Sequence, residues 1–272
     1  MTLSLDHLVW FAHKPEAAID ELKGMGIHAI QGGRHEKWGT YNSLAYFGLS
    51  YIEFIGIKNV SIAKKEKHNR LIIHIVEAMS EGNGEGPARI AIRTNHIEEL
   101  AEKFKKQGLA VFGPFPGERM TQEGEVLKWS LLFPEDPAST LQLPFFIQWE
   151  ETDDVRYASF KDKGLVGKHI ADNLKIESVG IAVRNLDETV NKWARLIDGT
   201  PGETYQSKIL SASYRELELS ESKLIFCTPN GRGIAQDVLT ERGETPFLVN
   251  FKGAEERKMI NKLNGYWGKN IF

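Results

Sequence analysis

One pattern recurs along this chain: a short strand-like run rich in β-branched residues, followed by a helix with an apolar stripe. The four copies of this opening span residues 5–25, 87–107, 176–197 and 245–263. In the second copy, Ile97, Leu100, Ala101 and Phe104 have the spacing of a helix face that packs on a core. An internal repeat constrains the fold strongly, because each copy predicts the same unit of supersecondary structure.

Strand-like runs follow each of the first three helices. They span residues 27–31, 40–47 and 51–57, then 109–112, 126–133 and 141–149, then 203–208, 211–219 and 223–227. The order strand, helix, strand, strand, strand therefore occurs three times, and a fourth copy is cut short after its helix. We expect an α+β fold of repeated β-α-β-β-β modules whose consecutive strands form hairpins.

Two segments stand outside the repeat. Residues 59–86 hold an apolar helical stripe and a glycine-rich end, which predict an inserted helix and a flexible linker. Residues 153–173 are polar and contain glycine, which is typical of a boundary. We therefore expect an N-terminal pair of modules at 1–152, and one module plus a truncated one at 174–272.

The composition argues against several classes of function. The formal net charge is −3 and no long basic stripe occurs, so we expect no nucleic-acid partner. Cys227 is the only cysteine, which excludes an intramolecular disulfide and a zinc ribbon. The N-terminus leads directly into a strand, and no apolar run approaches the length of a membrane span. These features favour a cytoplasmic protein with a small-molecule ligand and no membrane partner, and they leave a homodimer open.

Several motifs together carry a likeness to a known family. In the first module they read LDHLV at 5–9, GGRHEKWGTYN at 32–42 and YIEFI at 51–55. In the second they read GER at 117–119, LKWSLLFP at 127–134 and LPFFIQW at 143–149. Over residues 5–150 the chain resembles the glyoxalase-like domain family of the vicinal oxygen chelate superfamily. The resemblance implies that two modules pair into a cupped, incomplete barrel, which often holds a divalent metal that chelates substrate oxygens.

The metal ligands of that family usually come from the first and last strand of each module. The matching positions here are His7 and Glu53 in the first module, and Arg89 and Gln148 in the second. An imidazole and a carboxylate suit Mn, Fe, Ni or Zn, and Gln148 offers an oxygen. Arg89 cannot be a ligand, because its guanidinium has no lone pair to donate. We therefore expect His7, Glu53 and Gln148 as the metal set; the C-terminal modules show none.

Glu53 has two interpretations, because a carboxylate on a buried strand face needs a cation. It is either a catalytic metal ligand or the partner of Arg89 in a structural ion pair. His35 is the best additional general base. The cations of Arg34, Arg89 and Arg119 predict the binding of an anionic substrate, and Asn42 and Trp129 are further candidates for contact with it.

These features favour a glyoxalase-like enzyme of the lyase, isomerase or dioxygenase type that acts on an anionic or carbonyl-bearing metabolite. Two alternatives remain open at this point. The first is a metal-free protein of the same fold that binds or sequesters a ligand, which Arg89 in a ligand position favours. The second is an interaction or scaffold protein, which the apparent lack of a site in the C-terminal half favours.

Overall fold

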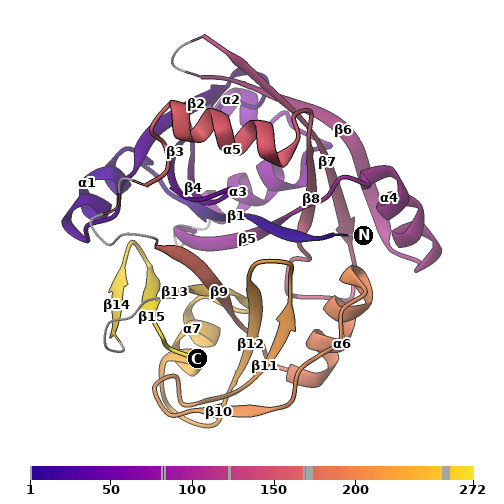
Figure 1. The fold of residues 1–272 in the computed structure, drawn as a ribbon. Coiled ribbons are helices and arrows are strands. Elements are labelled where there is room, and N and C mark those ends of the chain that lie inside the picture. Colours follow the sequence, from indigo (N-terminus) through magenta and orange to yellow (C-terminus); the bar gives the residue numbers. More distant parts are fainter. Residues whose placement is uncertain are drawn as a thin grey trace.

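A computed structural model describes residues 2–80, 82, 84–121, 124–167, 169, 174–252 and 258–272. Two sheets lie one above the other in Figure 1, each with its own helices. The first is a closed barrel of eight strands, and the second is a seven-stranded open sheet. The fold is thus α+β and built from repeated modules, as the repeat in the sequence predicts.

The barrel contains the first two modules. Its strands are β1 (Ser4–Phe11), β2 (Ile30–His35), β3 (Thr40–Phe47), β4 (Ser50–Ile57), β5 (Gly86–Arg93), β6 (Ala110–Met120), β7 (Val126–Glu135) and β8 (Phe145–Trp149). They follow one another around the ring in the order β1-β4-β3-β2-β6-β7-β8-β5. We expected an incomplete barrel; the ring is closed because β1 pairs with β5 on one side and β2 reaches β6 through the single pair Arg34–Met120 on the other.

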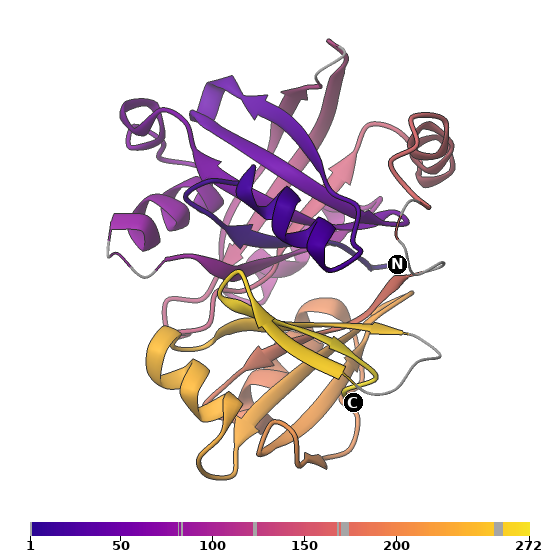
Figure 2. The same ribbon diagram turned by 90° about the vertical axis from the view of Figure 1, so that its left-hand side faces the viewer.

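Each module of the barrel carries one helix on the outside, and two further helical segments cover the barrel. The outer helices are α1 (Ala17–Gly24) and α4 (Ile97–Lys106). The inserted segment forms α2 (Val60–Ala63) and α3 (Arg70–Ser80), and α5 (Asp153–Asp162) follows the last strand. Figure 2 shows α3 in purple and α5 in salmon on opposite sides of the barrel. Leu71, Ile72 and Ile75 of α3 join the inner core of the barrel, whereas Phe160 of α5 packs on Tyr46.

The second sheet repeats the strand relations of the first. Its elements are β9 (Lys175–Ala182), α6 (Leu186–Ile197), β10 (Tyr205–Ser207), β11 (Ala212–Glu218), β12 (Lys223–Pro229), α7 (Ile234–Arg242), β13 (Thr245–Lys252), β14 (Lys258–Lys262) and β15 (Gly265–Lys269). The strands run in the order β10-β11-β12-β9-β13-β15-β14, with β9 parallel to β12 and antiparallel to β13, as β1 is to β4 and β5.

The prediction of a fourth helix at 254–263 is wrong for the part of this segment that the structure describes. Residues 258–262 form β14, which pairs with β15, while residues 254–257 lie outside the described residues. The turn between the two strands is formed by Leu263 and Asn264, which both have positive φ angles, of 57° and 59°. Two consecutive left-handed residues make the tight hairpin turn that matches the twist of paired strands, so the segment closes a hairpin.

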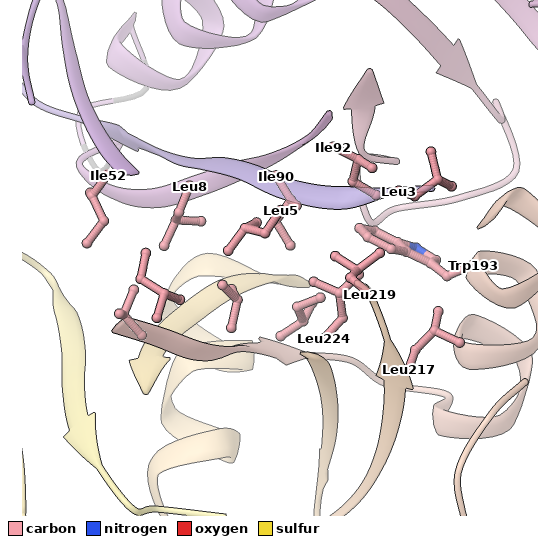
Figure 3. Close-up of a cluster of buried hydrophobic side chains, with 14 of the residues drawn as sticks. Leu3, Leu5, Leu8, Ile52, Ile90, Ile92, Trp193, Leu217, Leu219 and Leu224 are labelled. Atoms are coloured by element: carbon pink, nitrogen blue, oxygen red, sulfur yellow. The ribbon is translucent and has the colours of Figure 1, made fainter. Parts of the chain in front are cut away.

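The two sheets share one apolar core. Leu5, Leu8 and Ile90 point out of the barrel and meet Leu219 and Leu224 of the second half (Figure 3). Alternate side chains of a strand face opposite sides, so β1, which turns Leu8 outward, directs His7 and Val9 into the barrel. On the far side of the second sheet, α7 packs over a continuous apolar cluster that includes Cys227. Burial raises the pKa of that thiol well above its ordinary range, as expected of a packed residue.

Candidate functional site

A register shift in β1 brings two adjacent polar residues together. The pairing of β1 with β5 jumps from Leu5 to His7 and leaves Asp6 without a partner. The fully buried Asp6 carboxylate accepts a hydrogen bond from His7 Nδ1 at 2.7 Å and another from Trp149 Nε1 at 2.9 Å. A β-bulge of this kind often redirects a side chain next to a functional site.

Asp6 is held as an anion by the groups around it. Burial by itself would raise the pKa of its carboxyl. The hydrogen bond from His7 and the charges of Arg156, His7 and Arg93 outweigh that effect and hold the pKa well below its usual range. Because the anion accepts from Nδ1, the His7 ring keeps Nε2 free to face the interior of the barrel.

Glu53 of β4 lies on the other side of the His7 ring. Its Oε2 is 3.5 Å from His7 Nε2, and its Oε1 accepts a hydrogen bond of 2.5 Å from Asn42 Nδ2. The oxygen of the Asn42 amide accepts in turn from the Gly33 backbone at 2.9 Å and from an Arg119 Nη1 at 3.3 Å. Every one of these side chains is buried. A carboxylate, an imidazole, an amide and a guanidinium therefore form one connected polar cluster inside the barrel.

Arg119 carries the positive charge of this cluster. Burial alone would lower its pKa, but Tyr46, Tyr51 and Glu53 raise the pKa above its ordinary value. The guanidinium is thus a fixed cation within this buried polar cluster.

His35 of β2 also faces the interior, and it is a neutral ring. Its Nδ1 lies 3.0 Å from Thr40 Oγ1, and its ring packs against Trp38 and Trp129. Burial lowers its pKa to about 4, and the charges of Arg119 and His7 add to that effect against the opposing charge of Glu53. At neutral pH it can accept or donate a hydrogen bond but holds no charge.

Two cavities adjoin this cluster. The inner one has a volume of about 40 Å³ and is lined by His7, His35, Asn42, Glu53 and Arg119, with Trp129 and other apolar side chains around them. The second, of about 110 Å³, lies between the barrel and α5. Tyr51, Arg119 and Trp149 line both cavities, so the two cavities meet at these three side chains.

Three of the predicted site residues, Gln148, Arg34 and Arg89, lie outside the polar cluster. Gln148 points out of the barrel, because the neighbouring Ile147 and Trp149 point in, and its side chain accepts from the backbone of Ile97. Arg34 is exposed on β2, because its neighbour His35 takes the inward position.

Arg89 faces the interior but lies away from Glu53. Its Nη2 donates to the Leu143 carbonyl at 2.9 Å, and its guanidinium lies over the rings of Phe133 and Phe145. The alternative of an Arg89–Glu53 ion pair is therefore not the arrangement found, and Glu53 has Asn42 and His7 as its partners instead.

The donors that do meet are a poor fit to the expected metal. His7 and Glu53 supply one nitrogen and one carboxylate, and Gln148 is remote from them. In the described part of the chain no three His, Cys, Asp or Glu side chains converge at one point. Tight protein sites for Zn and similar ions generally have three or more protein ligands, so we derive no catalytic step through a metal.

Three residues of the site were not predicted from the sequence. Asp6 was visible as the neighbour of His7, and only the bulge turns it toward that ring. Tyr51 stacks on the His7 ring with centroids 4.6 Å apart, and Glu53 two positions later on the same strand face was the available signal. Arg156 comes from α5, inside a segment that we expected to be only a polar boundary.

Comparison with known proteins agrees with this architecture. The family model for the glyoxalase-like domain matches residues 5–197. The chain belongs to the glyoxalase-like domain family. A comparison with curated proteins finds no significant match.

Two solved structures show the family fold over almost all of the chain. A hypothetical protein from Staphylococcus aureus has a TM-score of 0.78 at 24% identity, covering 98% of this chain and 99% of the other. A mutant of 4-hydroxymandelate synthase from Streptomyces coelicolor has a TM-score of 0.60 at 9% identity, covering 93% of this chain and 72% of the other. At these identities the likeness concerns the fold alone. No helix in the described ranges is long and apolar enough to cross a bilayer.

Proposed function

We propose that this glyoxalase-like protein is an isomerase-type enzyme that transfers a proton at a carbon next to a carbonyl group of a small metabolite. The observation that carries the proposal is the contact of His7 Nε2 with Glu53 Oε2, 3.5 Å apart in a buried cavity, with Asp6 accepting a hydrogen bond from Nδ1 of the same ring. A carboxylate and an imidazole within reach of one proton form a general acid–base pair.

Each polar group of the cluster has a distinct part in this reaction. Glu53 Oε2 takes the proton from the carbon, and the electron pair of the C–H bond forms the double bond of an enolate. The carbonyl π electrons move to its oxygen, where the Arg119 guanidinium stabilises the negative charge. Return of a proton from Glu53 or His7 to the same carbon restores the carbonyl compound and is seen as exchange with solvent. Where that carbon bears a hydroxyl group, return of the proton to the former carbonyl carbon, with transfer of the hydroxyl proton to the former carbonyl oxygen, completes an isomerisation.

Asp6 is a positioning group in this scheme, and His7 is the second proton carrier. The Asp6 anion holds the ring so that Nε2 faces Glu53, and the His7 ring can take over the proton while the substrate rearranges. Asn42 donates to Oε1 of Glu53 and leaves Oε2 as the oxygen that meets substrate. Helices α3 and α5 cover the barrel interior and keep bulk water away, which strengthens the electrostatic interactions inside.

Solvent deuterium exchange tests this proposal directly. Pyruvate, methylglyoxal, dihydroxyacetone and levulinate would be incubated with the protein in deuterium oxide, and loss of the proton signals next to the carbonyl followed by NMR. We expect faster exchange for at least one compound, and a loss of about 100-fold or more in Glu53→Gln. The surface variant Glu36→Gln is the matched control. Exchange that stays at the uncatalysed rate for every compound would contradict the proposal.

A second candidate is a metal-free protein that binds a small anion without converting it. The observation that favours it is the pair of buried arginines, Arg119 and Arg156, that line the cavity below α5. Saturable binding without catalysed exchange in the same experiment would support this alternative over the enzyme.

A further inference from the structure

The cavity between the barrel and α5 is built by polar and apolar groups from both. Its volume is about 110 Å³, and it shares Arg119, Tyr51 and Trp149 with the inner cavity. For scale, an engineered apolar cavity of ~150 Å³ holds a benzene molecule. A small organic molecule that extends from one cavity to the other would have its ends in two different environments.

Arg156 of α5 is the unusual residue of this cavity. It is only 2% exposed, and its guanidinium stacks on the Trp149 ring at 4.1 Å from the centroid. Among the described residues, neither terminal nitrogen finds a hydrogen-bond acceptor. The nearest carboxylates are those of Asp6 and Asp153, each 3.7 Å from Nη1, which is too far for a hydrogen bond.

Those two carboxylates are already committed elsewhere. Asp6 accepts from His7 and Trp149, and Asp153 lies 2.9 Å from Nε of Arg93. They offset the charge of Arg156 at longer range but leave its N–H groups without acceptors. A buried cationic donor without an acceptor is costly, so an unmet guanidinium on a cavity wall indicates a missing partner.

The chemistry of the missing partner follows from the shape of the donor. A guanidinium presents two parallel N–H bonds in a plane, which match the two oxygens of a carboxylate. The Trp149 ring holds the plane of the Arg156 guanidinium in place. Arg119, which lines both cavities, supplies a second positive charge to the same cavity.

We propose that this cavity binds the carboxylate of a small organic acid, with Arg156 as its anchor. This assignment rests on the proposed function: the same molecule directs its carbonyl end past Arg119 to Glu53 and His7. It narrows the substrate class from carbonyl metabolites in general to short oxo acids.

Binding of two matched probes tests the assignment. Levulinate carries a ketone and a carboxylate, whereas butanone carries the ketone alone. Calorimetric titration of the intact protein should show binding of levulinate or of its shorter analogue pyruvate, at least about 10-fold tighter than that of butanone. Equal binding of the neutral ketone, or no binding of any of these acids, would overturn the proposal.

Variants of the anchor separate charge from geometry. Arg156→Gln removes both and should weaken binding of the acid by about 30-fold or more. Arg156→Lys keeps a charge but loses the planar fork, so it should recover only part of that loss. Unchanged affinity in Arg156→Gln would contradict the assignment, and would leave ordered water as the partner of the guanidinium.

Arg156→Gln removes a counter-charge of Asp6 and can fail to fold. Ser159→Phe therefore serves as a second variant, because Ser159 lines the same cavity and carries no charge. The larger side chain should exclude the acid from the cavity while circular dichroism remains that of the wild type. Retention of full affinity in a folded Ser159→Phe protein would count against the cavity as the binding site.

Glu53→Gln distinguishes this inference from the proposed function. If that variant binds the acid normally but no longer exchanges its protons, both stand. If it still catalyses exchange, the proposed function fails and the carboxylate site is unaffected. If the wild type catalyses exchange and Arg156→Gln leaves the KM for levulinate unchanged, the proposed function stands and Arg156 does not bind the carboxylate.

Discussion

His7 Nε2 lies 3.5 Å from Glu53 Oε2 on the inner wall of the barrel. Strands β1 and β4 are parallel neighbours, and Glu53 pairs with Val9, two positions beyond His7 on the same inward face. The contact depends on Asp6 on one side of the ring and on Asn42 beyond the carboxylate. Disturbing any of these neighbours should alter the reaction and leave the fold recognisable.

Asp6→Asn should reduce catalysed exchange by about 100-fold, because an amide no longer fixes the His7 ring with an anion. The loss should fall on kcat rather than on KM, and the pH profile of kcat should shift, since Asp6 acts through His7. The same change leaves Arg93 and Arg156 with one anion fewer and should cost about 3 kcal/mol in the free energy of unfolding. An unaltered pH profile together with the stability loss would indicate a purely structural role.

Stability should fall as the pH is lowered from neutral, partly because of His35. Its pKa is about 4 in the folded protein against 6.5 in the unfolded chain, so only the unfolded chain takes up the proton between these values. The stabilisation is complete above pH 6.5 and is lost progressively down to about pH 4, to a total of about 3 kcal/mol. Urea unfolding at a series of pH values measures this, and His35→Gln should flatten the slope; an equally steep slope in that variant would contradict the assignment.

Arg89→Met should leave catalysed exchange unchanged, because Arg89 lines neither cavity. Burial lowers the pKa of its guanidinium to about 10, and within the described chain its Nε and Nη1 lack acceptors. Replacing such a buried cation by an apolar side chain of similar length is often neutral or stabilising. We therefore expect a free energy of unfolding within about 1 kcal/mol of the wild type, or higher. A large loss of exchange activity would return Arg89 to the substrate site.

Prolonged dialysis against a chelator should change neither the melting temperature nor the exchange rate, since His7 and Glu53 alone make a weak metal pair. Elemental analysis before and after dialysis, with added Mn, Fe, Ni and Zn as a second arm, checks this. Stoichiometric metal that is bound by the wild type and lost in both His7→Ala and Glu53→Ala would instead establish a metal centre at this pair.

Gly32→Ala should impair the site by displacing Asn42. A methyl group at this position would collide with the Asn42 side chain, which holds both Glu53 and the Gly33 backbone. Exchange should fall by about 10-fold or more as Glu53 loses its donor. Gly24→Ala is the matched control, because the added carbon there meets open space. Equal activity of the two variants would show that Asn42 does not position Glu53.

Much of the architecture could be predicted from local patterns. The module order and the inserted helix rest on strand and helix periodicity, which are properties of short stretches of chain. His7 and Glu53 were identified as matching positions through the resemblance to the family. Asn42 and Arg119 were also identified, and the structure places both in the cluster. Gln148, which we expected as a metal ligand, lies on the outer face of β8, one position away from the inward-facing Ile147 and Trp149. A shift of one residue along a strand is enough to move a side chain to the opposite face of the sheet.

By itself, then, the sequence determined the repeated modules, because periodicity and turn residues act over a few positions, and its motifs pointed to His7 and Glu53 through a family resemblance. The tertiary structure alone decided the rest. The bulge that turns Asp6 toward His7 depends on pairing with a strand some eighty residues away, and the hairpin of β14 with β15 depends on a sheet to join. The arrival of Arg156 from α5 over Trp149 depends on how the end of the barrel is covered. Such contacts stabilise the fold only after segments far apart in the sequence have come together, so local sequence patterns do not predict them.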